Sequence, residues 1–185
     1  MTVDAADLVV PADGRILYFG RDRDRFRFLS HFHPSPIVID GEEWPTVEHY
    51  YQAQKSPDPG YRAAIRAAGR PGLAKRLAAP PSAPRRFSRD SWFRRHGTQP
   101  RADWHDVKLD IMRRADRAKY AQNAGLAALL LSTGGAELVE DSPDEPFWGT
   151  GPDGTGPDGA GLNWAGRVLM EVRAELRGRR RPDPA

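Results

Sequence analysis

The residues with the most chemical potential lie in one short segment, Trp44-Pro-Thr-Val-Glu-His-Tyr-Tyr-Gln-Ala-Gln-Lys55. If this segment is a helix, one of its faces carries Glu48, Gln52 and Lys55 at positions i, i+4 and i+7. Glu48 lies in the first turn, where the helix dipole favours the ionised carboxylate. Such a carboxylate can act as a general base or stabilise positive charge that develops in a transition state. The alternative interpretation is that Glu48 and Lys55 are ordinary surface charges.

Other kinds of chemistry find less support in the sequence. The chain has no cysteine, which excludes a cysteine nucleophile, disulfides and thiolate metal sites. His31 and His33, taken together with His49, resemble a metal cluster, but no paired HExxH-type spacing accompanies them. We therefore predict neither a metal nor any other cofactor.

The net charge of +3 is spread unevenly along the chain. Between residues 80 and 101, six arginines accompany a single acid, whereas residues 134 to 166 contain seven acids and no Lys or Arg. Aromatic residues interleave with these arginines, as phosphate contacts and base stacking on nucleic acid require. We therefore predict nucleic-acid contacts by Arg85, Arg86, Arg94 and Arg95. A solvated arginine-rich loop is the alternative.

Length and composition fit one loop-rich globular domain. The chain has 185 residues, of which 39% are hydrophobic, with 18 Gly and 17 Pro. No apolar run is long enough to span a membrane, and residues 1 to 14 carry acids where a signal peptide has basic residues. We expect a cytoplasmic protein with no membrane partner.

The elements that must position the candidate residues can be predicted from local patterns. Residues 16–19 read as a short strand, and residues 36–44 as a hairpin whose Asp40-Gly41 suits a type I′ turn. Thr46 can cap a helix that runs to about Lys55. Further helices are predicted at 59–68, 71–79, 103–122, 124–132 and 163–177, and residues 137–140 form a strand or an extended link.

These elements predict a single α+β domain, mostly helical with a small sheet or hairpin, over residues 15–177. Residues 1–14 and 178–185 lack a hydrophobic stripe and are expected to be flexible termini. The loop 141–162 contains an exact tandem repeat, Thr-Gly-Pro-Asp-Gly, and is too long to be a mere connector.

A series of motifs along the chain, in the same order as in a known family, gives the chain a family resemblance. The segment from Trp44 to Lys55 is accompanied by Phe28-Leu-Ser-His-Phe32, Pro34-Ser-Pro-Ile37, Trp104-His-Asp-Val-Lys108, Lys119-Tyr-Ala-Gln-Asn123, Leu138-Val-Glu140, Phe147-Trp-Gly149, Gly161-Leu-Asn163 and Gly166-Arg-Val-Leu-Met170. Together they resemble the NADAR (NAD- and ADP-ribose-associated) or YbiA-like family over roughly residues 16 to 177.

This resemblance implies a mostly helical α+β domain that hydrolyses N-glycosidic bonds. It places Glu48 and Lys55 in the catalytic block, with Gln52 on the same face as a substrate-binding residue. The matching pocket motifs contain Trp104, Asn123, Trp148, Gly149 and Asn163. The chain departs from the family pattern with His31 in place of the usual Asn, with His105 where an acid often follows the Trp, and with longer loops at 80–101 and 150–160.

Several roles stay open at this point. Lys55 can orient Glu48, hold a phosphate or ribose hydroxyl, or form a Schiff base with a ring-opened sugar. Trp104 and Trp148 can stack on a base or belong to the core, and Asn163 can bind ligand or simply cap the last helix. The backbone N–H groups of the loop 149–161 can cradle a phosphate or belong to turns.

Some family members cleave phosphoribosylamino intermediates of riboflavin synthesis, and others remove ADP-ribose from guanine in nucleic acid. We expect the second activity, on ADP-ribosylated guanine in DNA, because of the arginine-rich segment. The riboflavin activity and a non-catalytic ADP-ribose-binding module are the alternatives. The expected partners are an ADP-ribose-containing substrate, DNA as a candidate, and a cognate ADP-ribosyltransferase toxin encoded nearby.

Overall fold

A computed structural model describes residues 8–18, 25–152 and 161–179. The chain divides into two compact units. The terminal unit comprises residues 1–33 and 120–185, and the central unit comprises residues 34–119. The long helix α6 (Trp104–Gln122) begins in the central unit, and its last three residues belong to the terminal unit.

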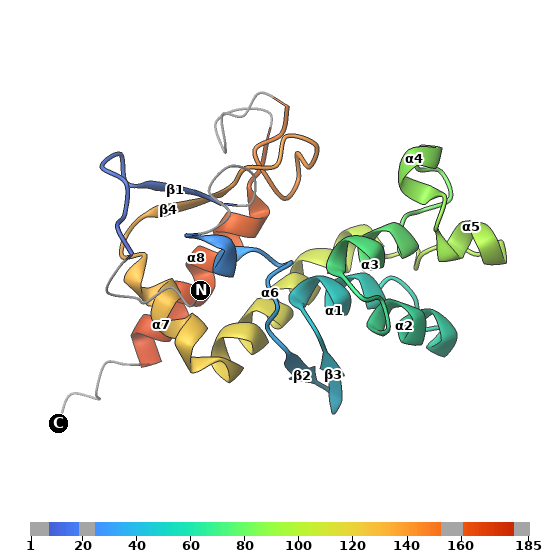
Figure 1. The fold of residues 1–185 in the computed structure, drawn as a ribbon, viewed down its shortest axis with the longest axis horizontal. Helices are drawn as coiled ribbons and strands as arrows, with labels where there is room; N and C mark the ends of the chain where they lie inside the picture. Colours follow the sequence, from blue (N-terminus) through green and yellow to red (C-terminus); the bar gives the residue numbers. More distant parts are fainter. Residues whose placement is uncertain (1–7, 19–24, 153–160, 180–185) are drawn as a thin grey trace. The chain divides into compact units, whose positions relative to one another are not determined.

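The terminal unit contains a two-stranded parallel sheet. Strand β1 (Arg15–Tyr18) pairs with β4 (Glu137–Glu140), and the two lie side by side in Figure 1. Ile16 and Tyr18 are fully buried while Leu17 between them is 42% exposed, the alternation of a half-buried strand. Residues 137–140 were predicted as either a strand or an extended link, and the strand is confirmed.

Helix α8 (Trp164–Arg179) packs against β4 and against α7 (Ala124–Ser132), and the 3-10 helix η2 (Arg27–Leu29) also contacts α7. The close approach of α8 to β4 depends on Gly166, where an added Cβ atom would lie 1.9 Å from the Leu138 carbonyl oxygen. The buried Arg173 holds the end of α7 by donating to Thr133 Oγ1 at 2.7 Å and to the Ala136 carbonyl at 2.8 Å.

The central unit begins with an antiparallel hairpin of β2 (Ile37–Ile39) and β3 (Glu42–Trp44). Both turn residues have positive φ, 54° at Asp40 and 76° at Gly41, as a type I′ turn requires. The predicted hairpin and its turn are confirmed.

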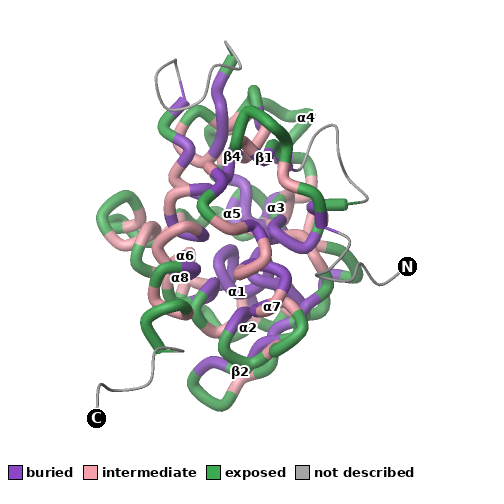
Figure 2. The backbone as a smooth tube through the Cα atoms, turned by 90° about the vertical axis from the view of Figure 1, so that its left-hand side faces the viewer, coloured by how far each residue is buried: buried purple, intermediate pink, exposed green. Residues whose placement is uncertain are grey.

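Helix α1 (Val47–Ala53) is buried along its whole length, as Figure 2 shows, and packs against α2 (Pro59–Arg66) and α3 (Pro71–Leu77). The Tyr61 hydroxyl on α2 donates a 2.7 Å hydrogen bond to the carbonyl of Gln52. The helices predicted at 59–68 and 71–79 are present, each ending two residues earlier than expected.

The arginine-rich segment holds two short helices that sequence patterns did not predict, α4 (Arg85–Ser88) and α5 (Trp92–His96). Ser91 anchors α5 twice, because its Oγ atom accepts from Arg94 N and donates to the Ala79 carbonyl at 2.6 Å. The Phe93 ring packs 4.9 Å from that of Tyr61. The segment is thus an ordered part of the central unit.

These elements confirm the predicted α+β class with helices in the majority. In the described residues, no helix is long and apolar enough to cross a membrane. Helix α8 continues to Arg179, and Leu8 is buried. Domain limits of 15–177 stay a prediction, and Phe19 and most of the tandem repeat lie outside the described residues.

Candidate active site

Helix α1 starts at a capping arrangement that also fixes a histidine. Thr46 Oγ1 accepts a hydrogen bond from His49 N at 3.2 Å and lies 2.8 Å from His49 Nδ1. The other ring nitrogen, Nε2, lies 2.9 Å from the Ala68 carbonyl. Since a carbonyl only accepts, Nε2 carries the proton and Nδ1 accepts from the Thr46 hydroxyl. Both ring nitrogens of His49 are engaged within the central unit, and the described residues contain no cluster of three or more metal-ligating side chains.

Glu48, the residue before His49, is the candidate catalytic residue on α1. Glu48 is only 5% exposed, which does not fit the interpretation of a solvated surface charge. Gln52, 3% exposed, donates from Nε2 to Glu48 Oε1 at 2.8 Å. These two side chains therefore lie on one helical face, as their spacing predicts.

Gln52 also presents a buried acceptor. Its Oε1 atom makes no hydrogen bond within the part of the chain that the structure describes. A buried amide oxygen without a partner is costly, so such an atom calls for an explanation. A hydroxyl or amine of a bound ligand would satisfy it.

Lys55 lies two residues beyond the end of α1 and contacts Trp104. Its Nζ atom donates to the Ala78 carbonyl at 3.2 Å and lies 5.4 Å from the centre of the Trp104 ring. That ring lies 4.9 Å from the ring of Tyr51. In the central unit, Glu48 and Gln52 therefore lie together on α1. Lys55, beyond the end of α1, contacts Trp104.

The other predicted site residues belong to the terminal unit. Asn163 has a positive φ of 49°, and its amide donates to the Leu138 carbonyl at 2.8 Å and accepts from Glu140 N at 3.0 Å. Its side chain thus bonds to β4 as a neighbouring strand would. This structural use was not foreseen; ligand binding by Asn163 stays a prediction.

The segment 146–149 covers the start of α8. The carbonyls of Phe147 and Trp148 accept from Trp164 N at 3.2 Å and Ala165 N at 3.1 Å. Gly149 is confined, because an added Cβ atom would lie 2.7 Å from that of Ser142. The first N–H groups of α8 are therefore occupied. In the loop 149–161, the N–H groups of Gly149, Thr150 and Gly151 also donate to backbone carbonyls, and residues 153–160 lie outside the described residues, so phosphate binding by this loop stays a prediction.

Asn123 lies at the start of α7 and is half-buried. Its carbonyl accepts from Ala127 N at 3.0 Å, and its side chain makes no capping hydrogen bond. The four predicted residues of this unit, Asn123, Trp148, Gly149 and Asn163, are thus positioned by the starts of α7 and α8.

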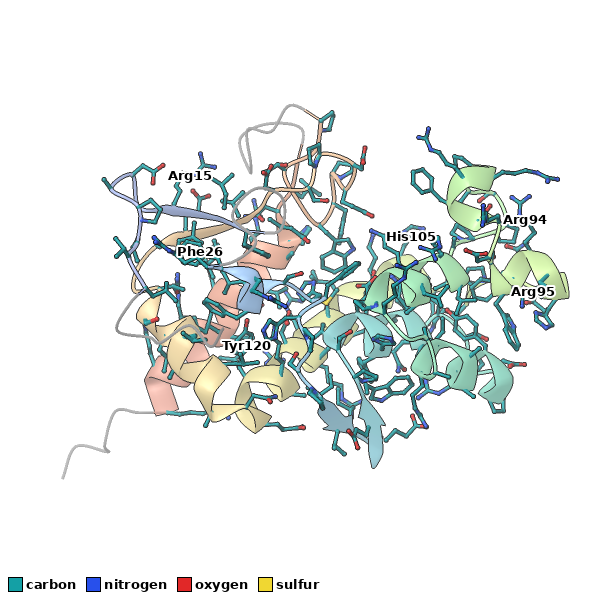
Figure 3. All side chains as sticks on the ribbon, viewed as in Figure 1. Arg15, Phe26, Arg94, Arg95, His105 and Tyr120 are labelled. Atoms are coloured by element: carbon teal, nitrogen blue, oxygen red, sulfur yellow. The ribbon has the colours of Figure 1, made fainter. Side chains whose placement is uncertain are left out.

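The four arginines that were predicted to contact nucleic acid differ in the contacts of their side chains. Arg94, which extends from α5 beside Arg95 in Figure 3, donates to the carbonyls of Pro81 at 2.6 Å and Ala83 at 3.2 Å. Arg86 lies 4.6 Å from the ring of Phe87, which is 48% exposed. Within the described residues, no hydrogen bond or ion pair engages the side chains of Arg85, Arg86 and Arg95, so Arg94 alone is tied to the loop.

Two charged residues that sequence reasoning missed are buried on α6. Asp116 and Lys119 are fully buried, and they lie three residues apart on the helix. Burial lowers the pKa of Lys119 to about 8, against an opposing effect of the Asp116 charge. The available signal was their spacing of three residues on α6, on the face that also carries the buried Met112.

Comparisons with known proteins identify the family of this chain. The NADAR domain model matches residues 17–177. N-glycosidase YbiA of Escherichia coli (strain K12) is 39% identical over 161 residues, which cover 87% of this chain and 88% of that protein. The chain is also 37% identical to riboflavin biosynthesis protein VVA0006 of Vibrio vulnificus (strain YJ016), over 86% of its own length and 38% of the relative.

A solved structure agrees with the sequence comparisons. The NMR structure of the Escherichia coli protein YbiA superposes with a TM-score of 0.73 at 35% identity, covering 97% of this chain and 94% of that one. The chain belongs to the NADAR domain family. The predicted family and the predicted enzyme class, a glycosidase, are confirmed.

Proposed function

We propose that this chain hydrolyses the N-glycosidic bond between a ribose and a base nitrogen, with Glu48 as its catalytic carboxylate. The observation that carries the proposal is the buried Glu48, held by Gln52 on α1. When the C1′–N bond breaks, its electron pair goes to the base nitrogen and positive charge develops at C1′. A water molecule then bonds to C1′, and its proton passes to Glu48 and on to the leaving nitrogen.

Lys55 supplies a cation to the same unit. Its contacts with Trp104 and the Ala78 carbonyl support a fixed ammonium that binds a phosphate or a ribose hydroxyl of the substrate. A Schiff base between Nζ and a ring-opened sugar is the covalent alternative. The buried Oε1 of Gln52 is available to accept a hydrogen bond from a sugar hydroxyl.

The substrate that we propose is ADP-ribosylated guanine in DNA, from which the enzyme removes ADP-ribose. The support is the set of Arg85, Arg86 and Arg95 on α4 and α5, together with the exposed Phe87 ring. Unpaired guanidinium groups bind backbone phosphates, and an exposed ring stacks on a base. A cytoplasmic location and a cognate ADP-ribosyltransferase toxin encoded nearby belong to the same proposal.

A second candidate substrate is a phosphoribosylamino pyrimidine of riboflavin synthesis. It is supported by the name of the Vibrio vulnificus relative, a riboflavin biosynthesis protein. Such a substrate is small and requires no contacts with a distant arginine surface.

The experiment that decides between the two incubates the full chain with each substrate at equal concentration and measures release of the free base. Faster turnover of ADP-ribosylated DNA supports the first proposal. Hydrolysis of the pyrimidine intermediate alone supports the second candidate.

A further inference from the structure

The turn that leads into α6 is bonded to the backbone of Lys55. Arg101 N donates a 2.8 Å hydrogen bond to the Lys55 carbonyl. Trp104 N donates to the Arg101 carbonyl at 3.3 Å, which closes the turn at the first residue of α6. One turn of the central unit therefore holds both the Lys55 backbone and the start of α6.

Two side chains of this turn are paired with each other. Arg101 donates from Nε to Asp103 Oδ1 at 2.5 Å and from Nη2 to Asp103 Oδ2 at 2.7 Å. Two parallel bonds between a guanidinium and a carboxylate fix the orientation of the groups as well as their distance. The hydrogen bond from the Arg101 guanidinium also lowers the pKa of Asp103, so this carboxyl is ionised at neutral pH.

Asp103 connects this ion pair to Trp104. Its carbonyl accepts from Asp106 N at 3.0 Å and from Val107 N at 3.2 Å, in the first turn of α6. Trp104 is the next residue along the chain, and its ring centre lies 5.4 Å from Lys55 Nζ. The turn therefore reaches Lys55 twice, through the Arg101 backbone and through the Trp104 ring.

The exposure of the ion pair indicates what it can contribute. Arg101 is one of the six arginines between residues 80 and 101, and its side chain is 37% exposed, against 50% for Asp103. An exposed ion pair adds little to the free energy of unfolding. Its bidentate geometry can nevertheless restrict the local conformation of the turn.

We propose that Arg101 and Asp103 are a positioning pair for Lys55. The pair holds Trp104 against the Lys55 side chain and so determines where the ammonium group is presented. In this role neither member of the pair contacts the substrate. The inference rests on the proposed function only for what Lys55 does to the substrate.

The direct test measures the reactivity of Lys55. The full chain is treated briefly with acetic anhydride, and acetylation of each lysine is followed by peptide mass spectrometry. To react, the Lys55 amine must leave the Ala78 carbonyl and the Trp104 ring. Arg101→Gln and Asp103→Asn should each speed acetylation of Lys55 about twofold to fivefold, the range that loss of an exposed ion pair gives.

Asp110→Asn is the matched control, because it breaks a 3.0 Å ion pair with Arg113 on α6 itself. It should leave acetylation of Lys55 unchanged, and Lys75 on α3 serves as the internal reference in every variant. Arg101→Lys keeps the charge without the planar fork, so its rate should lie between those of the wild type and Arg101→Gln. Thermal melting shows that each variant is folded.

Combining Arg101→Gln with Asp103→Asn distinguishes a pair from two independent contributions. If the two side chains act as one unit, the double variant should be acetylated at Lys55 no faster than the faster single variant. Independent contributions would instead multiply the two increases in rate.

Two results would overturn the inference: equal acetylation of Lys55 in Asp103→Asn and Asp110→Asn, or multiplied rates in the double variant. Failure of the proposed function is a separate observation. If Arg101→Gln speeds acetylation of Lys55 while kcat/KM for base release stays normal, the positioning pair is supported and the proposed role of Lys55 in the reaction is wrong.

Discussion

The amide nitrogen of Gln52 donates a 2.8 Å hydrogen bond to Glu48 Oε1, one helical turn earlier on α1. This bond holds one carboxylate oxygen of Glu48 in place. It also orients the Gln52 amide, whose own oxygen has no partner within the described residues. The position of the Glu48 carboxylate therefore depends on Gln52, whose amide takes up no proton.

Replacing Gln52 tests this dependence. We expect Gln52→Leu to lower kcat about tenfold to a hundredfold, because a loosely held carboxylate reaches the reactive geometry less often. Gln54→Leu is the control, since Gln54 ends the same helix and its side chain accepts from Arg62. Steady-state kinetics and thermal melting should be measured together. A Gln52→Leu enzyme with normal kcat would show that the hydrogen bond does not position Glu48.

Replacing Lys55 separates its two chemical roles. Lys55→Ala should lose most activity under either role. If Lys55 forms a Schiff base, borohydride added during turnover should leave the wild type, but not the Ala variant, covalently joined to sugar. Intact-protein mass spectrometry detects that adduct. Its absence from the wild type would leave the electrostatic role.

The arginine surface predicts a salt-dependent effect that is confined to DNA. Replacing Arg85, Arg86 and Arg95 with Ser should raise KM for ADP-ribosylated DNA and flatten its salt dependence by about 2 in the log–log slope, since each lost single-strand phosphate contact contributes about 0.7. Cleavage of ADP-ribosylated guanosine should not change.

Arg94→Ser is the contrasting variant. Because Arg94 bonds to two loop carbonyls, its loss should lower Tm with little change in salt slope. Unchanged DNA kinetics in the triple variant would instead favour the riboflavin substrate.

Lys119 predicts a pH dependence of stability. Burial lowers its folded-state pKa to about 8, below the 10.5 of an exposed lysine. Between these values the unfolded chain binds more protons, so this lysine makes stability rise with pH over that window. Below pH 8 its contribution is unfavourable by about 3 kcal/mol, from about 1.4 kcal/mol per pKa unit.

The matching experiment compares the wild type with Lys119→Met by denaturant unfolding at several pH values. The stability advantage of the variant should be largest at pH 7 and shrink as the pH rises to 10. A difference that stays constant over this range would contradict the lowered pKa of Lys119.

Much of the fold could be predicted because local signals specify it. Thr46 caps α1, and Asp40 and Gly41 tolerate the positive φ of the hairpin turn. The parallel pairing of β1 with β4 was beyond local patterns, because over a hundred residues separate the two strands. Helix α5 was also missed, since it depends on tertiary contacts of Ser91 and Phe93 rather than on helix propensity.

The candidate site was predicted best where spacing alone places side chains. Glu48 and Gln52 share a helical face for that reason. Asn163 and Arg94 were harder to interpret, because each uses its polar atoms on backbone groups far along the chain or in a neighbouring loop. A residue type indicates what a side chain can bond but not which partner the fold supplies.

The central claim is that Glu48 performs the chemistry, and Glu48→Gln tests it most directly. Glu43→Gln, on the exposed side of β3, is the matched control. Glu48→Gln should keep substrate affinity within a few-fold while turnover falls about a hundredfold to ten-thousandfold, because the amide keeps the shape but cannot take a proton. Single-turnover release of the free base measures this. Release by Glu48→Gln at a rate near that of Glu43→Gln would contradict the account.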